Sequence, residues 1–227
     1  MDKKFLNDIL EWDVTSWAQA LQYWELAVPW NRIEHCLELG GRNGGVSLWL
    51  ALKGKSVICS DLMNVEDQAE KLHQQYNLEK PITYQDIDAS NIPFKNTFDI
   101  IVFKSIIGGI GRNNDLDKQK QVFNEIRKAL KPGGILLFAE NLSASRFHQH
   151  LRKKYTNWGQ SWRYPSLYEM NDFLKDFSQV TIKTTGIMGT LGRNERQRKI
   201  LAKIDQLILN KLCPKHWKYI AYGVAQK

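Results

Sequence analysis

Short apolar segments of strand length alternate with amphipathic segments of helix length from residue 34 to residue 140. Each helix carries the chain back to the start of the next strand, so the strands must run parallel, with helices on both faces of the sheet. Ligands of such folds lie at the carboxyl ends of the strands. We therefore predict an α/β fold with a doubly wound sheet. The expected strands in this part are 35–39, 56–59, 82–85, 100–103 and 135–139, and the expected helices are 47–52, 66–76 and 117–130.

The alternation becomes less regular after residue 140. An insertion separates the last two expected strands, which favours an antiparallel pair at one edge of the sheet. The complete prediction is a seven-stranded, mostly parallel sheet whose last strand is antiparallel. The expected helices in this part are 146–154, 166–177 and 195–212, and the expected strands are 180–185 and 219–225.

The first thirty residues are expected to be helical. Apolar residues recur there at three- and four-residue spacing, and Ser16-x-x-Gln19 has the form of a capping box. We interpret Trp17 and Trp24 as core anchors, because large aromatic residues at helical spacing usually serve packing. A lid over a cofactor or substrate is the alternative interpretation.

Positive charge is concentrated in the last third of the chain. Residues 1–140 contain 16 Lys or Arg and 19 Asp or Glu, whereas residues 141–227 contain 16 and 5. This excess favours anionic partners such as phosphates, acidic lipids or nucleic acid. The three cysteines lack the spacing of a disulfide framework or a metal site, and neither a secretory signal nor an apolar run of ~18 residues is present. We expect a cytoplasmic protein, or one peripheral to a membrane, without a metal.

The length of 227 residues suits a single domain with a full-sized core. No repeat or flexible linker divides it. We expect an N-terminal helical cap over residues 1–33, a cofactor-binding half over residues 34–140 and a basic, substrate-side half over residues 141–227.

The segment 36–45 carries the sharpest local signal. An apolar strand with Glu38 near its end runs into a turn that contains Gly40, Gly41 and Gly44, and a helix follows. Glycines allow a ligand to touch the backbone, and the N–H groups at the start of a helix bind a carboxylate or phosphate. The pattern indicates a nucleotide-like ligand; a glycine turn that only reverses the chain is the alternative.

Two carboxylates follow the next two strands. Asp61 lies 21 residues after Gly40, and a carboxylate there can accept hydrogen bonds from both hydroxyls of a ribose. The alternative is that Asp61 caps the following helix. Asp88 precedes an apolar-Pro-Phe turn, where its carboxylate can accept from the exocyclic amine of an adenine while Ile87 or Ala89 contacts the ring.

These motifs, in this order, resemble those of class I (Rossmann-like) S-adenosylmethionine-dependent methyltransferases, and the resemblance covers residues 34–140. Residues 219–227 also resemble the antiparallel last strand of that fold. The resemblance implies an enzyme whose cofactor is S-adenosylmethionine. The matching motifs are Glu38-x-Gly40-x-x-x-Gly44, Asp61, Asp88-Ala89-x-x-Ile92-Pro93-Phe94, Phe98-Asp99-Ile-Ile-Val102 and Ala129-Leu130-Lys131-Pro132-Gly133-Gly134.

The resemblance also implies which residues contact the cofactor. In that family the glycine turn contacts the methionine part, the carboxylate after the second strand binds the ribose and the carboxylate after the third strand binds the adenine amine. The acidic residue before the turn orients the loop or reaches the cofactor's amino group through water, and residues after the fourth strand border the methionine part and the substrate. The positions carried over are Glu38, Gly40, Gly41, Gly44, Asp61, Leu62, Asp88, Ala89, Lys104 and Ser105.

One position departs from the family pattern. Arg42 stands where the family usually has its middle glycine, so its side chain must point away from the cofactor or reach the cofactor's carboxylate. The same residue breaks the G-x-G-x-x-G fingerprint of nicotinamide dehydrogenases, the competing class with a similar strand–glycine–helix opening.

Candidate acceptor-side residues follow the fifth strand. His148 and His150 are candidate bases for a hydroxyl acceptor, with surface histidines on a basic helix as the alternative. Trp162, Arg163 and Tyr164 belong to the aromatic segment 157–165, where such folds commonly build the acceptor pocket. Aromatic faces with a guanidinium suit a sugar, a ring or an anion; an anchored loop is the alternative.

We expect methylation of oxygen or nitrogen on a small-molecule, sugar-linked or lipid-linked acceptor. No Asn-Pro-Pro-aromatic motif follows the fourth strand, so DNA is not an expected partner. An RNA methyltransferase, or a cofactor-binding protein without catalysis, remains the alternative.

Residues 193–218 combine an apolar stripe with basic flanks. We expect this amphipathic helix to pack its stripe on the protein's own sheet. Peripheral contact with an anionic membrane and an RNA-facing surface are the alternatives. The stripe consists of Ile200, Leu201, Ile204, Leu207 and Ile208.

Overall fold

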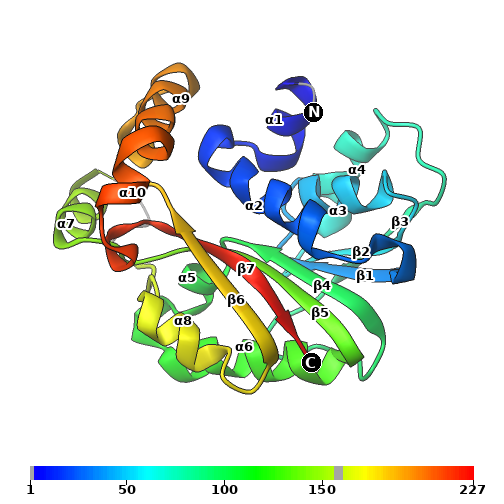
Figure 1. Cartoon of the computed structure of the whole chain (residues 1–227). Helices are drawn as coiled ribbons and strands as arrows, with labels where there is room; N and C mark the ends of the chain where they lie inside the picture. The colour runs from blue at the N-terminus through cyan, green and yellow to red at the C-terminus, as the bar shows by residue number, and fades with distance from the viewer. Residues whose placement is uncertain (1–2, 156–160) are drawn as a thin grey trace.

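The computed structural model describes residues 3–155 and 161–227, which form one seven-stranded sheet with helices on both faces (Figure 1). The strand order is β3-β2-β1-β4-β5-β7-β6. β7 pairs antiparallel with both β5 and β6, and the other pairs are parallel, as the sequence predicted. The strands are β1 (His35–Leu39), β2 (Ser56–Asp61), β3 (Ile82–Asp86), β4 (Phe98–Lys104), β5 (Leu130–Asn141), β6 (Ser178–Thr185) and β7 (Ile220–Gln226).

Strand β4 lies at the centre of the sheet and is buried on both faces. Ile100 and Val102 pack into one hydrophobic cluster, and Ile101 and Phe103 pack into the other. Successive side chains of a strand point to opposite faces, so a strand covered on both sides needs an uninterrupted apolar run. This explains why the sequence of β4 does not alternate between apolar and polar residues.

Ten α-helical segments are present in the described chain, and they surround the sheet on both faces (Figure 1). A π-helical turn, Asp205–Leu209, joins α9 to α10. The helices are α1 (Lys3–Leu10), α2 (Val14–Ala27), α3 (Gly45–Ala51), α4 (Val65–His73), α5 (Ile107–Ile110), α6 (Leu116–Ala129), α7 (Arg146–Tyr155), α8 (Leu167–Phe173), α9 (Glu195–Ile204) and α10 (Asn210–Leu212).

The N-terminal helices cover one face of the sheet. Trp17 and Trp24 are fully buried there, which confirms the interpretation as core anchors. The predicted capping box at Ser16 is wrong, because α2 begins at Val14 and Ser16 lies inside the helix. The Ser16 hydroxyl instead accepts a hydrogen bond from the hydroxyl of Tyr219.

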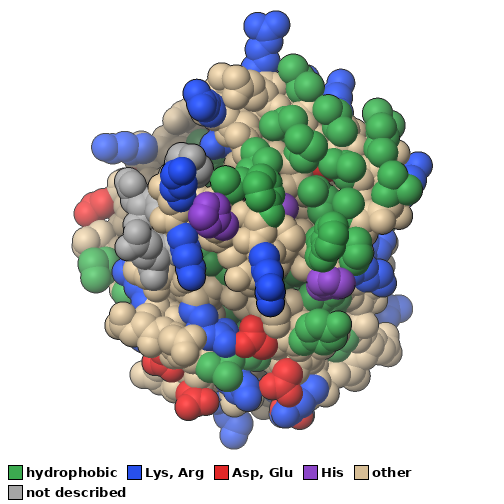
Figure 2. Space-filling model, turned by 90° about the vertical axis from the view of Figure 1, so that its left-hand side faces the viewer, with side chains coloured by type: hydrophobic (Ala, Val, Ile, Leu, Met, Phe, Trp, Pro, Cys, Tyr) green, Lys and Arg blue, Asp and Glu red, His purple; other side chains and the backbone are tan. Residues whose placement is uncertain are grey.

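The predicted packing of the α9 stripe on the sheet is also wrong. Ala202 and Asp205 face the protein and are buried, whereas large apolar side chains of the same segment are exposed. Figure 2 shows hydrophobic side chains gathered at the upper right, where α9 and α10 lie. Among the described helices, none has both the length and the apolar character needed to cross a membrane.

Candidate functional site

A glycine loop joins β1 to α3 at the carboxyl edge of the sheet. Gly40 and Gly44 have φ values of +67° and +71°, in the left-handed region that glycine adopts without strain. The Gly41 N–H donates to the Ser60 carbonyl at 2.8 Å and ties the loop to β2. A Cβ at Gly41 would lie 2.9 Å from the Cys59 sulfur, so no side chain fits there. Gly40 faces the side chain of Ile106, whose Cγ2 would lie 2.3 Å from a Cβ.

Glu38 lies buried beneath the glycine loop. Its Oε2 accepts hydrogen bonds from the Ser47 backbone N–H at 2.8 Å and from the Ser47 hydroxyl at 2.5 Å. Burial raises the pKa of Glu38 to about 7, although these hydrogen bonds act in the opposite direction. The structure thus places Glu38 where it fixes the loop against the start of α3.

Asp61 ends β2 beside the same loop. Its Oδ2 accepts from the Arg42 N–H at 2.9 Å, and its Oδ1 accepts from the Leu62 N–H at 2.7 Å. A carboxylate has about four acceptor positions, so Asp61 retains capacity for two further donors. Helix α4 receives its cap from another residue, Asp86, which accepts from the N–H groups of Asn64 and Val65. Asp61 is therefore held in place without serving as a helix cap.

Asp88 follows β3 and is half-buried. Its Oδ1 accepts from the Ser90 N–H at 2.8 Å and from the Ser90 hydroxyl at 2.7 Å, and the Lys118 ammonium lies 3.5 Å from Oδ2. Burial favours a higher pKa for Asp88, but the Ser90 hydrogen bonds and Lys118 outweigh it and lower the pKa. Asp88 is an ionised acceptor at neutral pH, with buried Ile87 and Ala89 on either side.

The side chain of Arg42 points away from the loop. Its guanidinium lies 3.5 Å from the Glu11 carboxylate, and the side chain is 66% exposed. Only the backbone N–H of Arg42 contacts Asp61. Of the two orientations considered from the sequence, the structure therefore has the outward one, and Arg42 does not block the carboxyl edge.

The turn between α1 and α2 covers the end of β4. The Lys104 ammonium donates to the Leu10 carbonyl at 3.4 Å and lies 5.4 Å from the centre of the Trp17 ring. Burial lowers the pKa of Lys104, although the Glu11 carboxylate acts against this effect. Sequence reasoning missed these contacts of Glu11 and Trp17 with Lys104, because both residues lie far from β4 along the chain.

Glu140, near the end of β5, fixes the loop after β4. Its Oε2 accepts from the N–H groups of Ile106 and Ile107 at 2.9 and 2.8 Å, and its Oε1 accepts from its neighbour Asn141. The Asn141 amide in turn donates to the Ser105 hydroxyl at 2.6 Å. Sequence reasoning missed Glu140; an acidic residue after a fully apolar strand was the available signal.

We expect Glu140 to make stability depend on pH. Burial raises its pKa to about 7 from an ordinary 4.5, so between these values the folded protein holds a proton that the unfolded chain has lost. Its contribution to stability therefore falls as pH rises through this window, by at most about 1.4 kcal/mol per pH unit. Urea unfolding at pH 5 to 7.5 should show a smaller decline for Glu140→Gln than for the natural protein. If the unfolding free energies of the two proteins declined equally with pH, Glu140 would not titrate in this range.

The candidate bases His148 and His150 occupy different environments. His148 is 3% exposed; its Nε2 donates to the Ile187 carbonyl, and its Nδ1 lies 2.7 Å from the Ser145 hydroxyl. Burial lowers the pKa of His148, so the ring is neutral at physiological pH with both nitrogens engaged. These contacts weigh against His148 as a base. His150 is exposed on α7.

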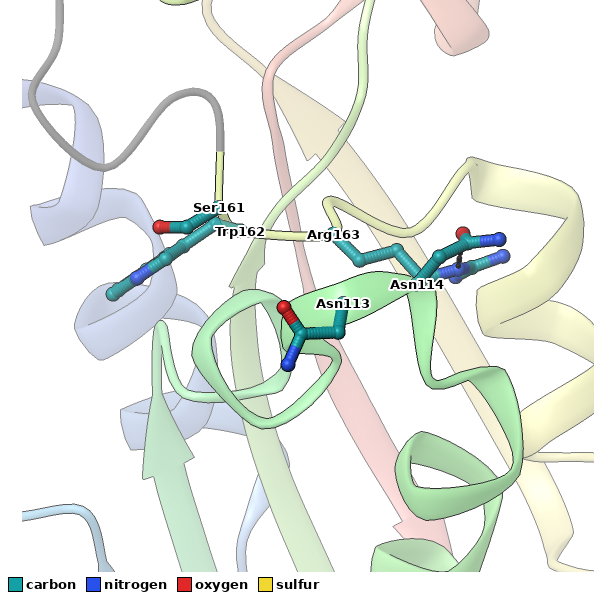
Figure 3. A pocket seen from close by; sticks show the side chains of 5 residues that line it. All are labelled: Asn113, Asn114, Ser161, Trp162 and Arg163. Atoms are coloured by element: carbon teal, nitrogen blue, oxygen red, sulfur yellow. Dashed lines mark hydrogen bonds between the residues drawn. The ribbon is translucent and has the colours of Figure 1, made fainter.

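Trp162 and Arg163 line an open cavity of about 360 Å³ together with Ser161, Asn113 and Asn114 (Figure 3). Figure 3 shows Arg163 directed toward Asn114 and away from Trp162. The Arg163 guanidinium donates to the side chains of Asn114 and Gln119 at 3.0 and 2.6 Å and pairs with Glu169. These bonds anchor the loop.

The two aromatic residues beside Arg163 pack against different parts of the protein. The Trp162 ring lies against Gly108 and Gly109, where a Cβ would approach it to 3.0 and 3.3 Å. Tyr164 lies beneath the Arg152 guanidinium, 4.2 Å from the ring centre. Residues 157–160 lie outside the described part of the chain.

The positions and the free acceptor capacity of Asp61 and Asp88 beside the carboxyl edge suit S-adenosylmethionine, and this argument does not depend on the family resemblance. Asp61 and Asp88 extend from the carboxyl ends of adjacent strands, both are only partly buried, and both keep acceptor capacity. Ligands of doubly wound sheets bind at this edge. With Arg42 directed outward, the residues present suit a ligand that carries a ribose and an adenine amine.

The strand order and this edge define a class I methyltransferase fold. Residues 37–138 match the family model described as "Methyltransferase domain", and solved methyltransferase structures share the fold of the chain. S-adenosylmethionine is the cofactor of this class. No curated protein sequence matches the chain.

Solved structures with the same fold include two N-methyltransferases and a methyltransferase described as a possible histamine N-methyltransferase. A Haemonchus contortus phosphoethanolamine N-methyltransferase with S-adenosyl-L-methionine has a TM-score of 0.65 and 18% identity, over 98% of this chain and 56% of that chain. NodS from Bradyrhizobium japonicum with S-adenosyl-l-homocysteine has a TM-score of 0.63 and 13% identity, over 99% of this chain and 97% of that chain. A possible histamine N-methyltransferase from Thermotoga maritima has a TM-score of 0.62 and 15% identity, over 99% of this chain and 97% of that chain. The chain spans about half the length of several similar structures, 55% and 51% for two others.

Proposed function

We propose that the protein transfers a methyl group from S-adenosylmethionine to a nitrogen or oxygen atom of a small-molecule, sugar-linked or lipid-linked acceptor. The observation that carries the proposal is that two carboxylates follow adjacent strands at one edge of the sheet: Asp61, which is hydrogen-bonded to the glycine loop, and Asp88. S-adenosylmethionine supplies an electrophilic methyl group on a sulfonium and leaves as a neutral thioether.

The chain's own residues orient and enclose this ligand in the proposed function. Asp61 accepts from the ribose hydroxyls and Asp88 from the adenine amine, while Glu38 keeps the loop in position. The cover formed by Leu10 and Trp17 over Lys104 excludes water from the methionine end. Holding the nucleophile about 3 Å from the methyl group and excluding water supplies much of the rate of such a displacement.

Nitrogen is the acceptor atom that the local geometry favours. His148 has both ring nitrogens engaged, and Lys104 donates to a backbone carbonyl. A neutral amine attacks without prior deprotonation, whereas a hydroxyl needs a base in the transition state. Of the similar structures, two are described as N-methyltransferases, one as a possible histamine N-methyltransferase and one as a carbon methyltransferase.

Calorimetric titration with S-adenosylmethionine, S-adenosylhomocysteine and NAD tests the proposal. We expect the first two to bind and NAD not to bind, because only the first two combine an adenosyl group with a methionine-type tail. Release of S-adenosylhomocysteine on addition of amines, alcohols and RNA then identifies the acceptor class. Binding of NAD alone, or of none of the three, would contradict the proposal.

A further inference from the structure

A row of large apolar side chains lies exposed along α9, the π-helical turn and α10. Leu207 and Leu212 are 71% and 76% exposed, values far above those of core residues. Contiguous exposed apolar patches are rare on soluble proteins and mark interaction surfaces. We call this row the α9–α10 stripe; it consists of Ile200, Ile204, Leu207, Ile208, Leu212 and, after a short turn, Trp217.

The outward orientation of the stripe is fixed by polar contacts on the opposite face of the same segment. The buried Asp205 carboxylate accepts from the backbone N–H groups of Ile187, Met188 and Gly189 at 2.9 Å. Gln206 donates to the Thr15 carbonyl at 3.3 Å. Rotating the helix to bury the stripe would leave Asp205 and three N–H groups without these bonds, which is costly. These polar contacts therefore keep the stripe exposed in the folded protein.

Basic residues accompany the stripe. Residues 193–218 contain eight Lys or Arg and two acidic residues, one of which is the buried Asp205. Figure 2 shows Lys and Arg around the hydrophobic patch, while Asp and Glu gather at the lower end of this face. The exposed basic residues on this segment include Arg196, Lys199, Lys203, Lys211 and Lys215.

We propose that the α9–α10 stripe rests on the surface of an anionic lipid bilayer. An interfacial helix lies in the membrane plane with aliphatic side chains among the acyl chains and Lys or Arg near acidic head groups. From Ile200 to Leu212 the segment extends about 18 Å, since a helix rises ~1.5 Å per residue. Trp217 adds an aromatic residue of the type that favours the membrane–water interface.

The charge and chemistry of the surface distinguish the bilayer from two other partners. A second copy of the chain in a symmetric dimer would bring the same basic rim against itself, which is repulsive. RNA would engage the cations, but single strands are bound by stacking on aromatic side chains, whereas the stripe is mainly Ile and Leu. An anionic bilayer satisfies both the aliphatic and the basic parts.

Vesicle sedimentation tests the proposal with the full chain. Wild-type protein should sediment with phosphatidylcholine vesicles that contain about 30% phosphatidylserine, and should bind pure phosphatidylcholine at least tenfold more weakly. A Leu207→Ser/Ile208→Ser/Leu212→Ser variant should bind the anionic vesicles more weakly than wild type, by a factor of about ten or more. The matched control, Leu26→Ser/Tyr168→Ser, replaces residues that are 88% and 77% exposed outside the stripe, and should bind like wild type.

S-adenosylhomocysteine affinity is measured in parallel to confirm that each variant is folded, and it also separates this proposal from the proposed function. The membrane proposal is overturned if wild type does not sediment with anionic vesicles or if the stripe variant binds as well as wild type. It is also overturned if the stripe variant only abolishes a concentration-dependent dimer in ultracentrifugation, or only lowers retention on RNA.

Discussion

Replacing Asp61 by Ala is expected to weaken the binding of S-adenosylhomocysteine by about 10- to 100-fold, or about 1–3 kcal/mol. The carboxylate would lose its hydrogen bonds to the ribose hydroxyls. It would also release the Arg42 and Leu62 N–H groups that it now holds at 2.9 and 2.7 Å, so the glycine loop would lose its fixed shape. Titration calorimetry measures the change directly.

Asp86→Ala is the matched control for this experiment. Asp86 is the register partner of Asp61 in the β2–β3 pair, but its carboxylate caps α4. Loss of this cap should cost stability of about 1 kcal/mol and leave ligand affinity within about threefold of wild type. Equal losses of affinity in the two variants would contradict the assignment of the ribose site to Asp61.

Replacing Gly45 by Ala is expected to destabilise the protein by about 2–3 kcal/mol. A Cβ there would lie 2.3 Å from the Ile9 carbonyl oxygen and 2.7 Å from that of Asp8, both backbone atoms at the end of α1. The added methyl group must therefore displace α1. Because the chain continues from α1 into the turn over Lys104, ligand affinity should fall as well.

Gly54→Ala separates this steric effect from the loss of a glycine in general. Gly54 has φ +73°, but the nearest atom to its Cβ is the end of the flexible Glu79 side chain, at 3.2 Å. This variant should lose about 1 kcal/mol in urea unfolding and keep its ligand affinity. If Gly45→Ala were no more destabilising than Gly54→Ala, α1 would not be packed on the glycine loop.

The sheet and the core of the site were predictable because their signals are local. Strand–helix alternation predicted the parallel strands, and the insertion between the last two strands predicted their antiparallel pairing. The 21-residue spacing from Gly40 predicted Asp61 as a ribose contact, which stays a prediction. A glycine turn and a strand end are each defined by a few consecutive residues. Their positions in the fold follow from the connection rules of parallel sheets.

The errors arose where distant residues determine a side chain's environment. Ser16 has the local form of a cap, but Tyr219 donates to its hydroxyl from the other end of the chain. The α9–α10 stripe has the local form of a core-facing helix, but Asp205 fixes the opposite face inward. The acceptor-side prediction for Arg163 stays a prediction, and the contacts of its guanidinium with Glu169 and Gln119 also come from residues that its local sequence does not identify. Periodicity gives the amphipathic face but not the direction in which it points.

A crystal structure of the protein with S-adenosylhomocysteine tests the central claim most directly. We expect the ribose hydroxyls within hydrogen-bond distance of the Asp61 carboxylate and the adenine amine within hydrogen-bond distance of Asp88, with the Arg42 guanidinium still directed toward Glu11. A ligand bound elsewhere, or the Arg42 side chain turned into the carboxyl edge between the two carboxylates, would contradict the account.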